Sequence, residues 1–203
     1  MKIRIVVFDG ADELDFVGPW EIFRRAARLQ DGVDVALVTL EQQPEVKAAA
    51  GLRVIPDAVL DDAVDVLVVP GGGYVGSAGR GVRAQIADGK LPRKIGELKR
   101  RRAVLAGVCT GVMILSATGL LDQRAAVTHH DALADLRKTA ANVIEARVVD
   151  DGAIVTCGGV TASLDLALWL TERLWGAEIA TRISADLEYK RTSDIHLGGP
   201  LKL

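Results

Sequence analysis

Apolar residues along the chain fall into short continuous runs that alternate with amphipathic stretches. Continuous apolar runs bounded by polar or glycine-rich turns are typical of strands that are buried on both faces of a sheet. The strands predicted in this way in the first half of the chain are 3–8, 33–40, 64–70 and 100–108. Between the first two, residues 19–29 place Trp20, Phe23 and Ala27 on one side, which predicts an amphipathic helix.

The same alternation continues to about residue 189. One or two helices are expected over 80–102, with a break at Pro92, and a small hairpin is expected around Gly51. A further hairpin is predicted around Asp151-Gly152, and the last predicted elements are helices at 161–175 and 177–189. Strands and helices that alternate this densely predict one α/β domain over 1–203, a three-layer sandwich with a mainly parallel sheet.

Composition and charge exclude several classes of protein but do not identify a function. The 203 residues carry a formal net charge of −2, which argues against a dominant nucleic-acid surface. No apolar run approaches the roughly 20 residues that a membrane-spanning helix needs, and the N-terminus lacks the features of a signal peptide. Two cysteines do not make a disulfide framework in a chain of this length. We therefore expect a cytoplasmic protein that binds neither nucleic acid nor membrane.

The stretch LAGVCTGVMILSATGLL, residues 105–121, places Cys109 where a buried strand must turn into a helix. A Gly-x-nucleophile-x-Gly turn of this kind is a nucleophile elbow. Glycines are expected at 107 and 111 because a Cβ there would clash as strand and helix approach. A helix N-terminus favours thiolate, so the elbow predicts a reactive cysteine with a lowered pKa. The alternative is a buried, inert cysteine.

Polar or glycine-rich segments follow three of the predicted strands. They are Asp9 to Asp15, Gly71 to Gly73 and the elbow itself. In an open parallel sheet, ligands bind at the carboxyl ends of the strands. The topology can bring these segments to one edge, and that convergence predicts an active site around Cys109. The Gly71-x-Gly73-x-x-Gly76 spacing is formally a dinucleotide fingerprint, but no acidic residue follows at the expected strand end, so no nucleotide cofactor is expected.

Three segments resemble the ThiJ/PfpI superfamily, whose members have a class I glutamine amidotransferase-like, flavodoxin-type fold. They are VVPGGGYVG (68–76), GVCTGVMILSATGLLDQRAAVTHH (107–130) and IVTCGGVTASLDLALWL (154–170). The segment DELDFVGPWEIF (12–23), together with Thr110 after the cysteine, resembles the isocyanide hydratase branch and related domains of some transcription regulators. The protease-like branch has His directly after the nucleophile, so Thr110 argues against a Cys-His peptidase.

The resemblance implies roles for individual residues. Asp15 would lie beside the Cys109 thiol and act as general acid/base, with a pKa raised by desolvation and by the thiolate. Its alternative role is to cap the following helix. Backbone N–H groups around Gly72 and Gly73, with that of Thr110, would form an oxyanion hole.

Other candidate residues carry weaker signals. The Thr128-His129 pair matches one found near the thiol in relatives, and His129 is equally compatible with a dimer contact. His130 and His196 have no readable role, and Cys157 is expected to pack in the core. No His, Cys or carboxylate spacing suggests a metal site.

These features predict a cysteine-dependent hydratase or lyase acting on a small-molecule electrophile, for which the resemblance implies an isocyanide. The alternatives are glyoxalase or deglycase chemistry on α-oxoaldehydes, and a sensor domain that retains the fold without catalysis. The resemblance also implies a homodimer. Phe16, Trp20 and Phe23 lie close together in sequence, and they are expected either at that interface or inside the monomer.

Overall fold

The computed structural model describes residues 1–76, 79–192 and 194–198. Its centre is a mainly parallel sheet, which in the described residues has eight strands in the order β12-β10-β11-β7-β6-β1-β2-β5. The strands of this sheet are β1 (Lys2–Val6), β2 (Asp34–Thr39), β5 (Ala58–Val59), β6 (Val66–Val69), β7 (Val104–Val108), β10 (Val148–Asp150), β11 (Ile154–Cys157) and β12 (Ile195–Leu197). The predicted fold class is confirmed.

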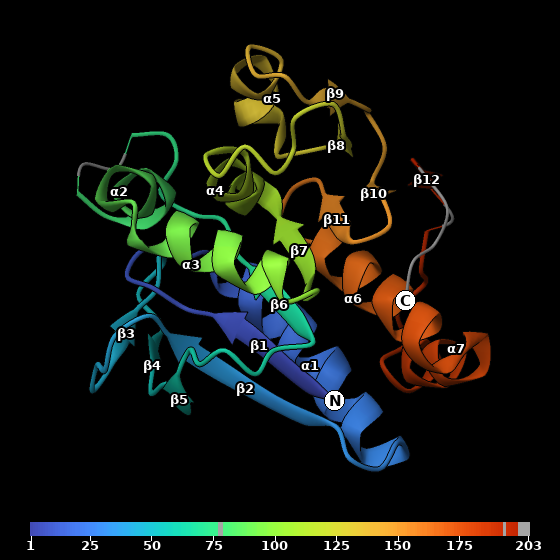
Figure 1. Cartoon of the computed structure of the whole chain (residues 1–203). Helices are drawn as coiled ribbons and strands as arrows, with labels where there is room; N and C mark the ends of the chain where they lie inside the picture. The colour runs from blue at the N-terminus through green and yellow to red at the C-terminus, as the bar shows by residue number, and fades with distance from the viewer. Residues whose placement is uncertain (77–78, 193, 199–203) are drawn as a thin grey trace.

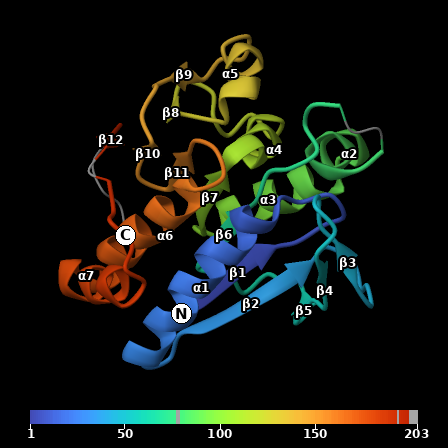
Figure 2. The same ribbon diagram turned by 180° about the vertical axis from the view of Figure 1, so that it is seen from behind.

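Helices cover both faces of this sheet (Figure 1). They are α1 (Glu13–Leu29), α2 (Gly81–Asp88), α3 (Lys90–Arg100), α4 (Val112–Ser116), α5 (His130–Leu136), α6 (Ala162–Trp175) and α7 (Ala177–Asp186). The helices α1, α6 and α7 pack against one another on one face, and α2, α3 and α4 do so on the other (Figure 2). The helix α5 contacts α4 and lies beyond it, beside the short strands β8 (Ala125–Ala126) and β9 (Asn142–Val143).

Both predicted hairpins are present. The first joins β3 (Val46–Lys47) to β4 (Arg53–Val54) around Gly51, and the second joins β10 to β11 antiparallel. The tail, for which no periodicity was found, contributes β12, which pairs parallel with β10. Residues 199–203 of that tail lie outside the described residues.

Two predicted helix boundaries were wrong. The helix predicted from residue 19 begins at Glu13, because Asp12 caps it by accepting the N–H of Leu14 at 3.2 Å. Pro19 lies inside this helix, so the carbonyl of Asp15 receives no helical N–H from position 19. The break in the 80–102 segment falls at Gly89, with φ of +71°, and not at Pro92, which lies in the first turn of α3. A proline is tolerated there because the N–H groups of a first helical turn have no partner within the helix.

The core fills the space between the sheet and both helical layers. Phe16 and Phe23 are completely buried within the chain, while Trp20 is only partly buried. The aromatic residues of α1 therefore pack mainly inside the monomer, and of the three only Trp20 retains surface for a partner.

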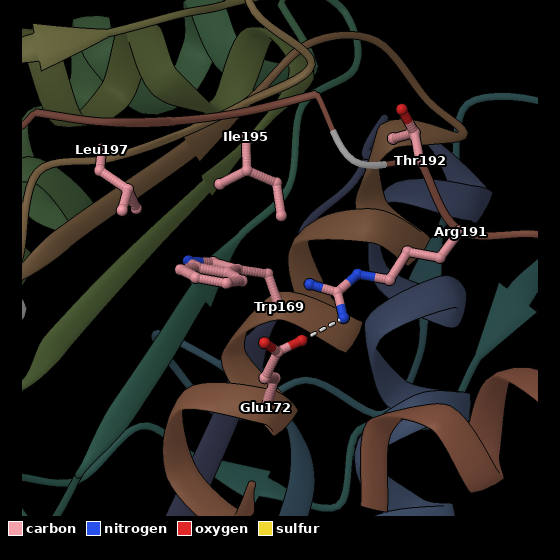
Figure 3. Close-up of a pocket in the computed structure, with 6 residues that line it drawn as sticks. All are labelled: Trp169, Glu172, Arg191, Thr192, Ile195 and Leu197. Carbon is pink, nitrogen blue, oxygen red and sulfur yellow. Dashed lines mark hydrogen bonds and ion pairs between the residues drawn. The ribbon is translucent and has the colours of Figure 1, made fainter. Parts of the chain in front are cut away.

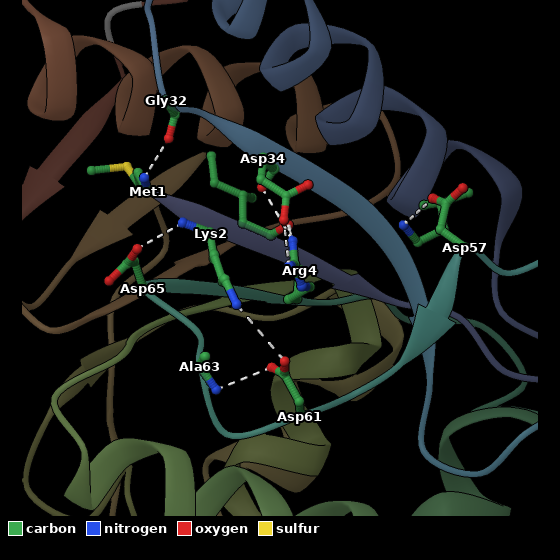
Figure 4. A network of polar contacts seen from close by, with 11 residues as sticks. Met1, Lys2, Arg4, Gly32, Asp34, Asp57, Asp61, Ala63 and Asp65 are labelled. Carbon is green, nitrogen blue, oxygen red and sulfur yellow. Dashed lines mark hydrogen bonds and ion pairs between the residues drawn. The ribbon is translucent and has the colours of Figure 1, made fainter.

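Polar contacts close the sheet at the amino-terminal end of β1 (Figure 4). The amino group of Met1 donates to the carbonyl of Gly32 at 2.5 Å, and the N–H of Lys2 donates to Asp65 at 2.6 Å. Arg4, largely buried, donates to Asp34 at 2.6 Å. This end carries structural ion pairs, whereas the segments predicted to form a site follow the opposite, carboxyl end.

Candidate active site

The predicted convergence of three segments is present. They follow β1, β6 and β7, which are immediate neighbours in the sheet. Because the three strands are parallel, their carboxyl ends meet at one edge. The first turn of α1, the glycine-rich turn and the elbow therefore lie side by side.

The elbow has the close approach that its glycines predict. A Cβ at Gly107 would lie 2.8 Å from Leu115 Cδ1, and a Cβ at Gly111 would lie 2.3 Å from the carbonyl oxygen of Val69. Between them Cys109 has φ of +53°, a left-handed conformation that L-residues rarely adopt. The strand thus turns sharply into a short 3₁₀ turn, Cys109–Gly111, and then into α4.

Neighbouring segments hold the backbone of Cys109 in this conformation. Its N–H donates to the carbonyl of Gly158 at 3.1 Å, and its carbonyl accepts the hydroxyl of Thr128 at 2.8 Å. The residue is only 6% exposed. Hydrogen bonds to Thr128, before α5, and to Gly158, after β11, therefore hold Cys109 in its strained left-handed conformation.

Asp15 reaches the elbow from the first turn of α1. Asp12 caps this helix, so the alternative role of Asp15 as its cap is excluded. The Asp15 side chain is fully buried, and its Oδ2 accepts the N–H of Gly71 at 2.9 Å. Within the described residues its other oxygen, Oδ1, has no hydrogen-bond partner of ordinary geometry. The hydrogen bond to Gly71 thus fixes Oδ2, while Oδ1 is available to exchange a proton.

Burial raises the pKa of Asp15 to about 8, and the nearby charge of Asp12 adds to the rise. The N–H of Gly71 and the Cys109 thiol act in the opposite direction, because both stabilise the carboxylate. Asp15 therefore holds a proton at neutral pH. Burial raises its pKa as expected, but the expected contribution of Cys109 was wrong, because the thiol stabilises the carboxylate.

The pKa of the Cys109 thiol differs from the prediction. Burial, and then the negative charge of Asp15, raise it to about 12, although the N–H groups of Val160 and Thr110 lower it. The expectation of a lowered pKa was wrong because α4 has only five residues, whereas desolvation acts on the whole thiolate. Thiol and carboxyl titrate as one pair, which holds both protons below about pH 8 and one proton above it.

The glycine-rich turn is bound to the other site segments. Besides the bond from Gly71 to Asp15, the N–H of Gly72 donates to Thr110 Oγ1 at 3.0 Å. This N–H is thereby already used, which contradicts the predicted contribution of Gly72 to an oxyanion hole. A Cβ at Gly71 would lie 2.6 Å from the Thr110 nitrogen, so only glycine allows this approach.

Val160 is a site residue that sequence reasoning missed. Its φ is +36°, a conformation that is unusual for a β-branched residue, and its N–H interacts with the Cys109 thiol. It follows Gly158 and Gly159 at the end of β11. That glycine pair at a strand end was the available signal, but nothing in the sequence showed that the segment returns to the elbow.

His129 lies at the rim of the site. Its ring covers Gly159, where a Cβ would lie 2.4 Å from His129 Cδ2. Its Nδ1 accepts the N–H of Asp131 at 3.2 Å and so caps α5, and burial lowers its pKa. His129 is therefore neutral at pH 7 and braces the turn before Val160.

His129, His130 and Asp131 are the three residues whose possible metal-ligand atoms lie within 4.8 Å of one another. They are consecutive in the chain, two are exposed, and Nδ1 of His129 already serves as the helix cap. This local crowding provides no closed set of ligands comparable to known metal sites.

Cys157 is fully buried and forms no disulfide, as is expected of a core cysteine.

A separate pocket of about 450 Å³ lies between α6 and the C-terminal segment (Figure 3). It is lined by Trp169, Glu172, Arg191, Thr192, Ile195 and Leu197, none of which is a predicted site residue. Among the described residues, no helix combines the length and apolarity needed to cross a bilayer.

Comparisons with known proteins agree with this geometry. Residues 1–173 match the DJ-1/PfpI family. An isonitrile hydratase from Pseudomonas putida is 33% identical over 98% of this chain and 83% of that protein. A Parkinson disease protein 7 homolog from Danio rerio is 28% identical over 93% of this chain and 97% of that protein. The crystal structure of a THiJ/PfpI family protein from Pseudomonas syringae superposes with a TM-score of 0.83 at 29% identity, covering 94% of this chain and 76% of that one.

Proposed function

The chain belongs to the DJ-1/PfpI family, and we propose that within this family it is a cysteine-dependent hydratase that converts an isocyanide to an N-substituted formamide. The observation that carries the proposal is the buried, proton-holding carboxyl of Asp15 beside the Cys109 thiol. The 33% identity to an isonitrile hydratase over almost the whole chain supports the choice of substrate.

The first step forms a covalent adduct on Cys109. The thiolate attacks the terminal carbon of the isocyanide and forms a C–S bond, while Asp15 transfers its proton to that carbon. The product of this step is a thioimidate, in which the former terminal carbon carries one hydrogen. The attacking species is the pair that holds one proton, in the arrangement with that proton on Asp15 and thiolate on Cys109, so turnover should rise as pH increases through about 8.

The second step hydrolyses the adduct. The Asp15 carboxylate removes a proton from water as the water oxygen adds to the same carbon, and Asp15 then passes this proton to the imine nitrogen. As the C–S bond breaks, Asp15 takes up the proton of the new hydroxyl group and the formamide is released. The pair returns to its starting state, with the proton on Asp15 and thiolate on Cys109, so that one water is consumed per isocyanide. The N–H groups of Val160 and Thr110 stabilise negative charge on sulfur when it forms and when it leaves.

Thr110 fits this chemistry better than peptidase chemistry. The Thr110 hydroxyl accepts the N–H of Gly72, and the backbone N–H of Thr110 interacts with the Cys109 thiol. A Cys-His peptidase needs an imidazole in contact with the thiol. Within the described residues, the groups that act on the Cys109 thiol are Asp15, Asp12 and the backbone N–H groups of Val160 and Thr110, and none of them is an imidazole.

The protein is further proposed to act as a homodimer in the cytoplasm. Val17, Leu52 and Ile55 are 37%, 46% and 79% exposed, a high exposure for aliphatic side chains. The Glu13 carboxylate accepts the N–H groups of Ala50 and Leu52, so α1 and the β3–β4 hairpin form one surface beside the site. Two unpaired cysteines are compatible with a reducing compartment.

Incubation with an aryl isocyanide tests the proposed reaction. We expect formamide from the wild type and none above background from Cys109→Ala, with Asp15→Asn slowed by roughly 100-fold or more. Methylglyoxal, offered in parallel, measures the α-oxoaldehyde alternative. Equal turnover by the wild type and Cys109→Ala would refute the hydratase, and consumption of methylglyoxal alone would replace it by the alternative.

A further inference from the structure

The glycine-rich turn is attached to α5 through Tyr74. The Tyr74 hydroxyl donates to Asp135 Oδ2 at 2.8 Å, and Asp135 lies in the last turn of α5. Arg83, from α2, donates its Nε–H to the Tyr74 carbonyl and places its guanidinium 4.2 Å from the centre of the Tyr74 ring. The tyrosine is therefore held at its backbone, its ring and its hydroxyl.

Tyr74 immediately follows the residues that donate to the site. Gly71 donates to Asp15, and Gly72 donates to Thr110. A pocket of about 380 Å³, lined in part by Tyr74, Arg83, Met113 and Thr139, adjoins the tyrosine. The Tyr74 side chain borders this space and is otherwise only 6% exposed, so its polar contacts hold the turn together with core packing.

The other end of α5 contacts the opposite side of the site. His129 caps α5, and its ring rests on Gly159, next to Val160. One short helix thus connects the turn that supports Asp15 with the turn that supports the thiol. Figure 1 shows α5 beyond α4, at the same end of the molecule as both turns.

We propose that Tyr74 is a positioning residue for the reaction. Its hydroxyl bond to Asp135 fixes the turn 71–73 against α5 and thereby sets the hydrogen bond from Gly71 to the Asp15 carboxyl. This inference rests on the proposed function for its kinetic consequence. Its structural consequence concerns only the state of the Asp15–Cys109 pair and does not depend on the substrate.

Loss of the hydroxyl should change the titration of the pair in a defined direction. The Gly71 N–H stabilises the Asp15 carboxylate, so a weaker bond makes the first proton of the pair harder to remove. The other charged group that acts on the pair is Asp12, which raises the pKa of both members. The hydrogen bonds of the described residues do not join Asp12 to Tyr74, so Tyr74→Phe leaves this charge in place.

The rate of Cys109 alkylation by iodoacetamide, measured against pH, is the principal test. Tyr74→Phe keeps the ring beneath Arg83, and Asp135→Ala removes the acceptor. Both should move the midpoint upward by roughly half a pH unit or more. Asp135→Asn retains an acceptor oxygen and should stay near the wild type. The matched control is Tyr189→Phe, which removes a hydroxyl bond of 2.7 Å to Asp165 and should leave the midpoint unchanged.

Steady-state kinetics with an aryl isocyanide provide the second measurement. Tyr74→Phe should lower kcat roughly tenfold while KM stays within about twofold, and Tyr74→Phe/Asp135→Ala should be no worse than either single variant. An unshifted midpoint in folded Tyr74→Phe, or the same shift in Tyr189→Phe, would overturn the inference. If the wild type has no isocyanide turnover, the proposed function fails, and the alkylation profile still decides the role of Tyr74.

Discussion

The two cysteine thiols differ in their surroundings at the scale of single residues. Cys109 lies at a turn and retains a small exposed area, whereas Cys157 is completely enclosed in β11. Burial raises the pKa of both thiols, and Cys157 has in addition no contact with solvent. Reactivity therefore depends on access and on the Asp15–Cys109 pair, and not on a generally acidic thiol.

Brief treatment with iodoacetamide should label Cys109 much faster than Cys157. The reason is that a reagent can reach Cys109 without opening the core, and two backbone N–H groups favour its thiolate. Peptide mass mapping after short exposure measures both sites in one sample, and Cys109→Ala shows the background at Cys157. Preferential labelling of Cys157 would contradict the assignment of the nucleophile.

The raised pKa of Asp15 makes stability depend on pH. The unfolded chain loses the Asp15 proton near the ordinary pKa of 3.8, while the folded protein keeps it to about 8. Between these values the folded state binds the extra proton, so this group's contribution to the free energy of unfolding falls as pH rises.

Asp15→Asn removes that dependence while retaining an acceptor for the Gly71 N–H. We expect the variant to gain stability relative to the wild type on the order of 1 kcal/mol per pH unit between about pH 5 and about pH 8. Urea unfolding at both ends of this range measures the difference, with exposed Asp31→Asn as a control. A constant difference between variant and wild type across this range would show that Asp15 is ionised in the folded protein.

At the scale of elements, the position of Asp15 depends on how α1 packs against α6. A Cβ at Gly18 would lie 2.7 Å from Ser163 Oγ, and Ser163 donates to the carbonyl of Leu14 at 3.0 Å. The two helices therefore touch about one turn away from the Asp15 carboxyl. Any separation of α1 from α6 would also displace Asp15.

Gly18→Ala should destabilise the protein by about 1–3 kcal/mol, because the added methyl group overfills a close contact. The matched control is Gly96→Ala in α3, where a Cβ meets only the flexible end of Arg100, at 3.9 Å. This second change should stabilise by up to about 1 kcal/mol through helix propensity. Thermal unfolding of both variants compares them directly. Equal effects would mean that Gly18 is not in tight contact with α6.

At the scale of the whole molecule, the proposed homodimer needs exposed apolar side chains. Phe16 and Phe23 are buried in the core, whereas Val17, Leu52 and Ile55 are among the exposed aliphatic side chains, and we propose that the interface includes them. The hairpin that carries Leu52 is bound to the first turn of α1 through Glu13. Association there would hold the segment that contains Asp15 against the elbow.

Light scattering at micromolar concentration should give a mass near twice the 21.6 kDa of one chain. Ile55→Asp should shift the mass toward the monomer, because it places a charge in an apolar contact. Leu197→Asp, at an exposed aliphatic side chain on the edge strand β12, serves as the control. A monomeric wild type would refute the proposed homodimer.

The sequence determined the class of fold and the position of the sharp turn that carries Cys109. Continuous apolar runs identify strands buried on both faces, and glycines at 107 and 111 permit a turn that other residues would block. Both signals are local, because periodicity and steric freedom belong to neighbouring residues in the chain. These signals misplace the ends of helices in two cases. One is a helix whose start is set by a capping side chain, as at Asp12, and the other is a helix that contains a proline, as at Pro19 and Pro92.

The tertiary structure decided which groups act on the nucleophile. Asp15 and Val160 act on Cys109 from segments that are distant in the chain, and Gly71 holds Asp15 there; the pKa of the thiol follows from burial together with Asp15 and Val160. Desolvation depends on all the atoms packed around a group, and an N–H reaches a thiol only when separate strands are in register. Neither quantity can be read from the residues on either side of Cys109.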